Sequence, residues 1–457
     1  MAYRTAPEGR SWARSADRQV ARRAARASAL FGFRRALLRR VPLRHVVLAL
    51  CALVGASLVG AGCAIDPLET ERTAANESQR FNRVELLRVD PDGGEGRLTP
   101  AALEAAVVEL IGNAARTVDV AFEDFESEAV ASALLEAHRR GVRVRVIGDE
   151  DKRSQAGFRL LQDSLPDGPS MVFGDGPSLY IPVPGVEIPR PGSHNRMTHN
   201  VILVDQTTIV NLSAGFPANR FDLHQLGYLA FSFDLGIDWN AELQQLHGGV
   251  FAITTSAFNG PVKSITDSRV TYPGTIEDFE HYFGPQERTL KHLIDEVFRA
   301  RASVWVAAEA LTNEFLLGAL TYKARAGFDV RVVLDRDGAG ETGSVYLPLL
   351  EAIVELNSGE AWPVALRAPD LRMNLVIIDA VPSPINGVQY ETRAYVASQP
   401  FFSSIPWQRE GTSGTSRPAD AFMDSNLWAV RAVPERYEPA LEVLITTFAE
   451  LLEGGTP

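Results

Sequence analysis

The sequence predicts an α/β protein whose body consists of two similar halves in tandem. Residues 110–151 and 293–337 carry the same pattern, in which identical residues recur at one constant offset. The identical pairs are Ala121 and Ala307, Glu123 and Glu309, Gly141 and Gly327, Asp149 and Asp335, and Asp151 and Asp337. A second observation is that apolar residues alternate between helical spacing and short β-branched runs within each copy.

Each copy has the same order of expected elements. A helix precedes a short strand, at 118–122 in the first copy and at 303–308 in the second. A second helix follows and ends at a glycine, and a further strand comes next, at 142–149 or 330–335. Strand, helix and strand in this order imply a parallel pair joined by a right-handed crossover. We therefore expect two similar sheets.

The chain divides into five expected segments. They are a basic leader with an apolar segment at 1–62, a polar tether at 63–80, a first half at 81–253, a linker at 254–284 and a second half at 285–457.

The leader is typical of an export signal. The basic run FRRALLRRVPLRH precedes the apolar run VVLALCALVGASLVGAGCA. Residues 60–63 resemble a bacterial lipobox with Gly60 in place of the usual leucine, so Cys63 is the expected lipidation site. Residues 33–39 also resemble a twin-arginine signal. The alternatives are an uncleaved membrane anchor, or cleavage to a soluble periplasmic or secreted protein. All of them place the body in the cell envelope or outside the cell.

The charge of the body argues against nucleic acid as a partner. The first 62 residues hold twelve arginines against Glu8 and Asp17, a net charge of +10. Since the whole chain has a formal charge of −12, the rest of it carries −22. Binding to phosphate backbones depends on lysine and arginine, and such a body repels them. Both cysteines, Cys51 and Cys63, lie at the leader, so the body has neither a disulfide nor a cysteine metal site.

Each half carries one further apolar strand that ends in aspartate, THNVILVD at 198–205 and RMNLVIID at 372–379. A second strand with a serine-containing turn follows, VNLSAGF at 210–216 and YVASQPF at 395–401. This arrangement resembles the phospholipase D superfamily, in which each half contributes His-x-Lys, four residues, Asp, and then a Gly-Ser-x-Asn turn. The resemblance covers about residues 82–450 and implies two phospholipase D-like α/β/α sandwich halves related by a pseudo-two-fold axis.

Most chemical groups of the family motif are replaced in both halves. In the family, one histidine attacks phosphorus, the other protonates the leaving oxygen, and lysine and asparagine side chains hold the phosphoryl oxygens. The aligned positions hold Thr198 and Arg372 for histidine, Asn200 and Asn374 for lysine, Leu212 and Ala397 for glycine, and Gly215 and Pro400 for asparagine. The retained members of the catalytic set are Asp205, Asp379, Ser213 and Ser398. The resemblance therefore implies a degenerate site.

A shift of one residue would place His199 at the nucleophile position. The strand from His199 to Asp205 is then one residue short, and such a slip turns every side chain to the opposite face. The last histidine of the chain is His292, and the four lysines lie outside both motifs. A mechanism with two histidines and two lysines cannot be assembled. A cleft carboxylate within hydrogen-bond reach of His199 would nevertheless favour an altered hydrolase, whereas Thr198 and Arg372 meeting across the interface would favour a binding protein.

Arg372 is the cation at the expected centre of the site. Its guanidinium could bind a phosphate or a carboxylate with two hydrogen bonds, or it could form a structural ion pair with Asp379 or Asp370. Asn200 and Asn374 keep a hydrogen-bond donor without a charge, so they could bind a polar ligand or only satisfy neighbouring groups.

The sequence thus favours a lipid-anchored envelope protein with a degenerate phospholipase D-like site. Its expected ligand is a phospholipid headgroup, a phosphodiester or an envelope partner. The alternative is a phosphodiesterase or phospholipase-type hydrolase that uses His199, or Glu123 and Glu309 as acid and base if they face the cleft between the halves. The sequence implies no cofactor and no metal ion.

Overall fold

A computed structural model gives the structure of most of the body. It describes residues 82–164, 168–174, 196–247, 269–270, 278–284, 287–335, 364–367, 371–401, 404–407, 415–418, 423–432 and 439–453. The leader, the tether, Cys63 and most of the expected linker lie outside these residues.

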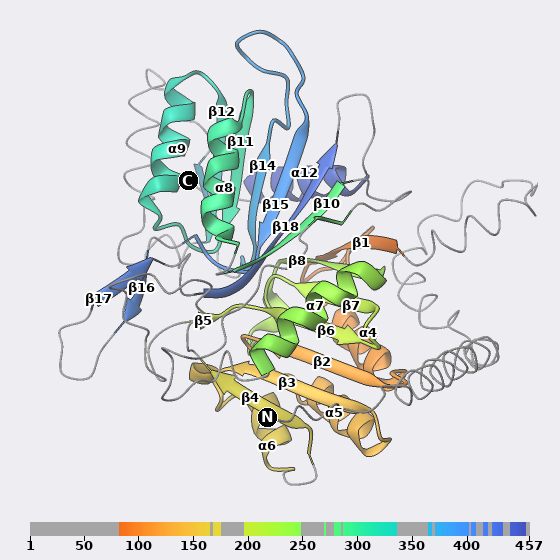
Figure 1. Ribbon diagram of the computed structural model, residues 1–457. Helices are drawn as coiled ribbons and strands as arrows, with labels where there is room; N and C mark the ends of the chain where they lie inside the picture. Colours follow the sequence, from red (N-terminus) through yellow and green to blue (C-terminus); the bar gives the residue numbers. More distant parts are fainter. Residues whose placement is uncertain are drawn as a thin grey trace, which may run out of the picture. The chain divides into compact units, whose positions relative to one another are not determined.

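The first half is built on a seven-stranded mixed sheet (Figure 1). Its strands, in spatial order, are β1 (Asn82–Val89), β8 (Gln225–Ser232), β7 (Thr208–Leu212), β6 (Asn200–Val204), β2 (Thr117–Phe122), β3 (Arg143–Asp149) and β4 (Ser170–Gly174). Strands β2, β3 and β4 are parallel, and the other neighbours are antiparallel. The helices are α4 (Pro100–Gly112), α5 (Glu128–Arg139), α6 (Ala156–Gln162) and α7 (Phe233–Gln245).

The second half repeats this sheet. Its strands, in spatial order, are β9 (Arg269–Val270), β10 (Asp278–Gly284), β18 (Met423–Ala432), β15 (Thr392–Ala397), β14 (Asn374–Ile378), β11 (Ser303–Ala308), β12 (Asp329–Asp335) and β13 (Val364–Arg367). From β10 to β13 this order matches β1 to β4, with the same parallel and antiparallel neighbours. The expected two-half α/β fold is therefore confirmed.

The helices of the second half lie on both faces of its sheet (Figure 1). Helices α8 (Thr289–Arg299) and α9 (Glu314–Arg325) pack on one face, and α12 (Pro439–Glu453) packs on the other. Strand β10 ends the segment expected to be a linker, so the second sheet draws on chain before residue 285. The short strand β5 (Arg196–Met197) of the first half pairs with β18, and β16 (Ser404–Trp407) pairs with β17 (Thr415–Pro418).

Local sequence signals explain where the equivalent helices begin and end. Ser127 and Asn313 accept backbone N–H groups in the first turns of α5 and α9, as N-cap residues do. Gly141 and Gly327 follow these helices with positive φ angles of 88° and 84°, which glycine adopts without the steric cost of a Cβ atom.

One hydrophobic core is shared by the two halves. It joins Leu203 and Trp239 of the first half to Trp305, Trp428 and Phe448 of the second. A separate core lies beneath α8 and α9. Within the part of the chain that the structure describes, no helix is both long enough and apolar enough to span a membrane.

Candidate functional site

The two motif strands enter their sheets at equivalent places. The backbone N–H of Met197 donates to Asp149 Oδ2 at 2.9 Å, and that of Leu371 donates to Asp335 Oδ2 at 3.0 Å. Both aspartates are buried at the carboxyl ends of β3 and β12. They fix the backbone directly before each motif, a positioning role that their recurrence in the repeat alone does not reveal.

The first residue of each motif bonds to the opposite half. Thr198 donates its backbone N–H to the carbonyl of Asp424 at 2.8 Å, and Arg372 donates its own to the carbonyl of His224 at 3.1 Å. The motif strands therefore cross the interface reciprocally. This geometry brings the two positions expected for histidine to the boundary between the halves.

The retained serines reinforce this crossing. Ser213 Oγ donates to the carbonyl of Arg372 at 2.6 Å and accepts the backbone N–H of Leu226 at 3.1 Å. Ser398 Oγ lies 3.0 Å from Thr198 Oγ1 and accepts the backbone N–H of Asn426 at 2.9 Å. Each serine thus touches the motif strand of the other half.

Asn200 and Asn374 are buried and make the same contact. The Oδ1 atom of Asn200 accepts the backbone N–H of Glu123 at 3.1 Å, and that of Asn374 accepts the backbone N–H of Glu309 at 3.2 Å. Gly215 lies so close that a Cβ atom there would be 2.4 Å from Asn200 Oδ1. Both asparagines therefore tie their motif strand to the neighbouring strand end.

Asp205 and Asp379 lie at the far end of the motif strands from Thr198 and Arg372. The carboxylate of Asp205 accepts the backbone N–H groups of residues 115 to 117 at 2.7 to 3.0 Å. That of Asp379 accepts those of residues 301 to 303 at 2.7 to 3.3 Å. Both aspartates have positive φ angles, 50° and 58°. The structure gives them backbone contacts. It does not bring them to the crossing point, the place where Thr198 and Arg372 each bond to the opposite half.

Arg372 forms its ion pair with Glu309, an arrangement that the sequence did not predict. The guanidinium bonds to Glu309 Oε1, and the side chains are 37% and 24% exposed. Glu309 follows β11 as Glu123 follows β2. Asp379, one expected partner, is instead held by the backbone, and Asp370 lies outside the described residues. The centre therefore presents a partly exposed cation beside a carboxylate.

His199 points to the other side of its strand. Its Nε2 lies 3.1 Å from Glu242 Oε1, and its Nδ1 lies 3.1 Å from Asn426 Nδ2. Since Asn426 Oδ1 accepts from Asn211 Nδ2 at 3.2 Å, the amide of Asn426 donates to Nδ1, and Nε2–H donates to the carboxylate. A carboxylate is thus within reach of His199, but both side chains have zero exposure and lie in the core beside Trp239.

The polar partners of His199 could not be predicted from the sequence, because they lie on elements far apart in the chain. Glu242 lies on α7, Asn211 on β7 and Asn426 on β18. The sequence contains only a weak signal for their burial: Glu242, Asn211 and Asn426 are polar residues within otherwise apolar segments. His281 on β10 is similar: it is fully buried, and neither ring nitrogen has a hydrogen-bond partner among the described residues. Burial therefore holds its pKa well below the ordinary value, and nearby His199 adds to this effect.

Comparisons with known proteins agree with this architecture. Residues 107–225 match the family model described as "Cardiolipin synthase, PLD-like domain". A mitochondrial cardiolipin hydrolase of Xenopus laevis is 30% identical over 123 residues, which are 27% of this chain and 50% of that protein. The chain thus spans about half the length of this relative.

One solved structure extends the likeness of the fold to both halves. The phosphatidylserine synthase of Haemophilus influenzae Rd KW20 matches with a TM-score of 0.52 at 13% identity, over 84% of this chain and 91% of that one. Nuc of Salmonella typhimurium, a phospholipase D family member, matches 36% of this chain and 93% of its own, at 17% identity and a TM-score of 0.27.

The fold and the motif strands define a two-half α/β protein with a PLD-like domain in its first half. Residues 107–225 carry the PLD-like domain of the phospholipase D superfamily, and the second half repeats the same strand order.

Proposed function

We propose that this chain is an envelope protein that uses the centre of a phospholipase D-like fold to bind an anionic phosphodiester, such as a phospholipid headgroup, without the two-histidine hydrolysis of the family. The observation that carries the proposal is that the two motif strands meet at the crossing point and that Arg372 lies there, partly exposed. Thr198 and Asn200 occupy one motif, and Arg372 offers a partly exposed guanidinium in the other. Guanidinium groups bind phosphate oxygens with two hydrogen bonds.

The carboxylate of Glu309 competes with such a ligand. A phosphodiester would displace it from Arg372, so the ion pair holds the guanidinium in place until an anion binds. Phosphoryl transfer additionally needs a nucleophile and a proton donor, and His199 is enclosed in the core. The names of the relatives, a cardiolipin hydrolase and a phosphatidylserine synthase, support a phospholipid as the ligand class.

The second candidate is an altered hydrolase. The hydrogen bond between His199 and Glu242 favours it, because a carboxylate orients a histidine in many active sites. This reaction would require a path from solvent to a side chain that is fully buried here.

The test measures turnover and equilibrium binding of bis-p-nitrophenyl phosphate by the purified full-length protein. We expect no turnover, and binding that weakens at least tenfold in Arg372→Ala. Arg372→Lys keeps the charge and should bind with intermediate affinity, because an ammonium group cannot make the two parallel bonds. Glu309→Gln removes the competing carboxylate and should strengthen binding by up to about fivefold.

The catalytic alternative needs its own controls. Turnover by the wild type that disappears in a folded His199→Gln variant would overturn the proposal. A variant that carries Thr198→His, Asn200→Lys, Arg372→His and Asn374→Lys restores the family's groups. Turnover gained there would show that the fold still positions them. Equal binding by wild type and Arg372→Ala would exclude the crossing point as the ligand site.

A further inference from the structure

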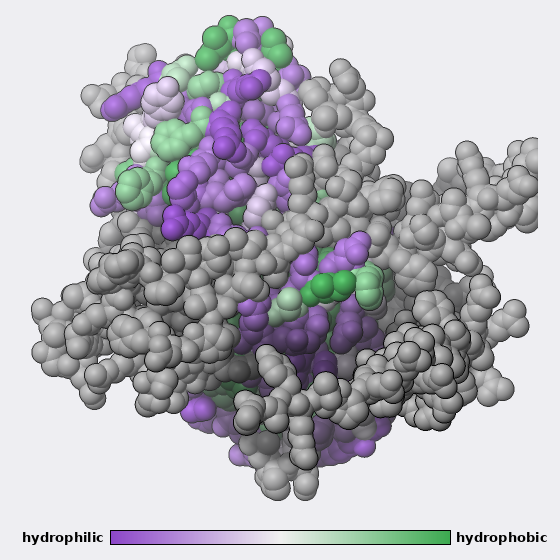
Figure 2. All heavy atoms as spheres, in the orientation of Figure 1, coloured by the Kyte–Doolittle hydropathy of each residue, from purple (hydrophilic) through white to green (hydrophobic). Residues whose placement is uncertain are grey.

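An exposed apolar surface lies at the end of the second half that is opposite to the crossing point. The connection between β14 and β15, residues 379–391, forms a long hairpin loop with Ile385 and Val388 at its tip. These side chains are 63% and 46% exposed. Phe298, at the end of α8, and Tyr322, on α9, are 49% and 60% exposed. We call these four side chains the hairpin end, and Figure 2 shows hydrophobic surface at the tip of this hairpin.

Hydrogen bonds hold the tip in a defined shape. Gly387 donates its backbone N–H to the carbonyl of Ser383 at 2.8 Å, and Ser383 donates to the carbonyl of Val388 at 2.9 Å. Gly387 has a φ of 70°, a conformation that glycine adopts without strain. The apolar side chains of the tip are therefore presented on a fixed turn.

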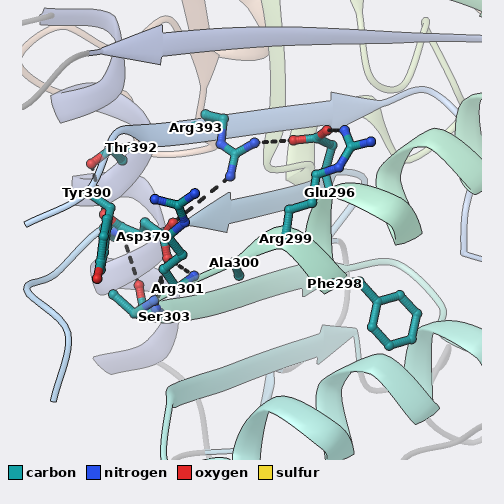
Figure 3. A network of polar contacts seen from close by, with 12 residues as sticks. Glu296, Phe298, Arg299, Ala300, Arg301, Ser303, Asp379, Tyr390, Thr392 and Arg393 are labelled. Atoms are coloured by element: carbon teal, nitrogen blue, oxygen red, sulfur yellow. Dashed lines mark hydrogen bonds and ion pairs between the residues drawn. The ribbon is translucent and has the colours of Figure 1, made fainter. Parts of the chain in front are cut away.

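The base of the hairpin is joined to the neighbouring helices. The guanidinium of Arg301 stacks 5.3 Å from the ring centroid of Tyr390, and Ala380 N–H donates to Ser303 Oγ at 2.9 Å. In Figure 3, Arg301 lies between Tyr390 and the end of α8, whereas the Phe298 ring points away from the polar network. The rings of Phe298 and Tyr322 are 6.3 Å apart. The four apolar side chains thus belong to one end of the half.

The first half is an internal control for this surface. At the positions equivalent to Phe298 and Tyr322 it has Gly112 and Glu136, and a turn of three residues, 205–207, takes the place of the long hairpin. The same sheet and helix pair therefore form with a short turn and without apolar side chains at these two helix positions. Exposed apolar side chains that a fold does not require indicate an interaction surface.

Three arginines lie beside this surface, together with Asp295, Asp329 and Glu391. Arg299 and Arg301 lie at the end of α8, and Arg325 lies at the end of α9. Glu296 is buried and is paired with Arg299 and Arg393, and Asp379 is bound by backbone amides, which leaves Glu391 as the acidic residue of the loop. The body as a whole carries a formal charge of −22, so arginines beside apolar side chains are a local exception. Aliphatic tips, aromatic rings and arginines together are typical of surfaces that bind anionic bilayers.

We propose that the hairpin end docks on an anionic lipid bilayer. Ile385 and Val388 enter the boundary between headgroups and acyl chains, and Arg299 and Arg301 contact the lipid phosphates. This contact is independent of the proposed ligand site, because Arg372 lies just before β14 and the hairpin follows its other end.

The experiment places a polarity-sensitive fluorophore on the tip. The full-length protein with Cys51→Ser, Cys63→Ser and Ile385→Cys is labelled and mixed with vesicles of phosphatidylcholine, with or without phosphatidylglycerol. Its matched control carries Phe233→Cys instead, at an exposed apolar residue of α7 that is 60% exposed. We expect blue-shifted emission of the tip label, and quenching by spin-labelled lipid, only on the anionic vesicles. The control label should remain in water.

Unlabelled variants give a second measurement. Ile385→Asp with Val388→Asp should weaken binding to the anionic vesicles at least tenfold, because charged side chains replace apolar ones that would enter the lipid. Phe233→Asp with Ile237→Asp should leave binding unchanged. A tip label with the same emission on vesicles as in buffer overturns the proposal. So does a blue shift without vesicles that rises with protein concentration, since a second copy of the chain would then cover the surface.

Discussion

Asn200 and Asn374 occupy the positions at which the resemblance to the phospholipase D family predicts lysine. Each side chain is buried, and its oxygen accepts the backbone N–H of the glutamate at the end of the neighbouring strand. A lysine at either position could not accept this bond, because its ammonium group has only donors. Asparagine therefore supplies a fixed, uncharged backbone contact at this position in both halves.

Asp205 and Asp379 end both motif strands, and each accepts hydrogen bonds from three consecutive backbone N–H groups. We expect Asp205→Ala to lower the free energy of unfolding by about 2–4 kcal/mol, because three N–H groups lose a charged acceptor and alanine disfavours the positive φ. Urea unfolding of the full-length protein measures this. Asp205→Asn keeps one acceptor oxygen and should lose less. Unchanged stability together with lost ligand binding would show that the carboxylate acts on a ligand instead.

At the scale of elements, a buried polar chain joins α7, β6, β18 and β7. It runs from Glu242 through His199 and Asn426 to Asn211 and crosses from one half to the other. A complete set of buried hydrogen bonds adds little to the free energy of unfolding, but removal of one member lowers it strongly, because a buried polar group is then left without a partner.

We expect Asn426→Ala to lower the free energy of unfolding by about 2–4 kcal/mol, because His199 Nδ1 and Asn211 Nδ2 both lose their bond to this side chain. A double-mutant cycle with Asn211→Ala measures the coupling, which we expect to be about 0.5–1.5 kcal/mol. Strict additivity of the two changes would contradict a direct bond. For the same reason His199→Gln is a better test of catalysis than His199→Ala, since glutamine keeps a donor for Glu242 and alanine does not.

Strand β10 places His281 among Tyr228, Trp239, Phe279 and Phe283. Because burial lowers its pKa in the folded state, the unfolded chain binds a proton below about pH 6.5 that the folded protein does not. Stability should therefore fall as the pH drops from about 6.5, with a contribution of at most about 1.4 kcal/mol per pH unit.

His281→Phe tests this pH dependence. The ring fits an aromatic environment and carries no titratable group, so the variant should lose less stability between pH 6.5 and pH 5 than the wild type. Urea unfolding at a series of pH values measures the difference. His292, whose pKa burial also lowers, keeps its own contribution in both proteins. Parallel pH profiles for the two proteins would show that His281 has the same pKa in the folded and unfolded states.

For the whole molecule, the shared core couples the two halves. Helix α12 belongs to the second half, yet it contacts β1, and its Glu450 pairs with Arg88 and Arg97 of the first half. With the reciprocal crossing of the motif strands, neither half completes its core alone.

We therefore expect the described body to unfold in one cooperative transition. Far-ultraviolet circular dichroism and tryptophan fluorescence should give the same urea midpoint, and Asp205→Ala and Asp379→Ala should each shift the whole transition although they lie in different halves. Two separate transitions, of which each variant shifts only one, would show that the halves fold independently.

The repeat made most of the fold predictable. The gap-free match of 110–151 with 296–337 identified the parallel strands and the helices between them, and the motif segments identified two further strands of each half. The role of β10 was not predicted, because its place depends on pairing with β18, which follows it by more than a hundred residues. The leader and Cys63 remain predictions.

The sequence by itself determined the two-half architecture and predicted which residues occupy the motif positions, because periodicity and residue identity are local properties of a chain. Only the tertiary structure decided which way the side chains point. It turned His199 into the core towards Glu242, paired Arg372 with Glu309, and set Thr198 against Ser398 of the other half. These contacts join residues 43 to 200 positions apart, and chain packing alone brings such residues together.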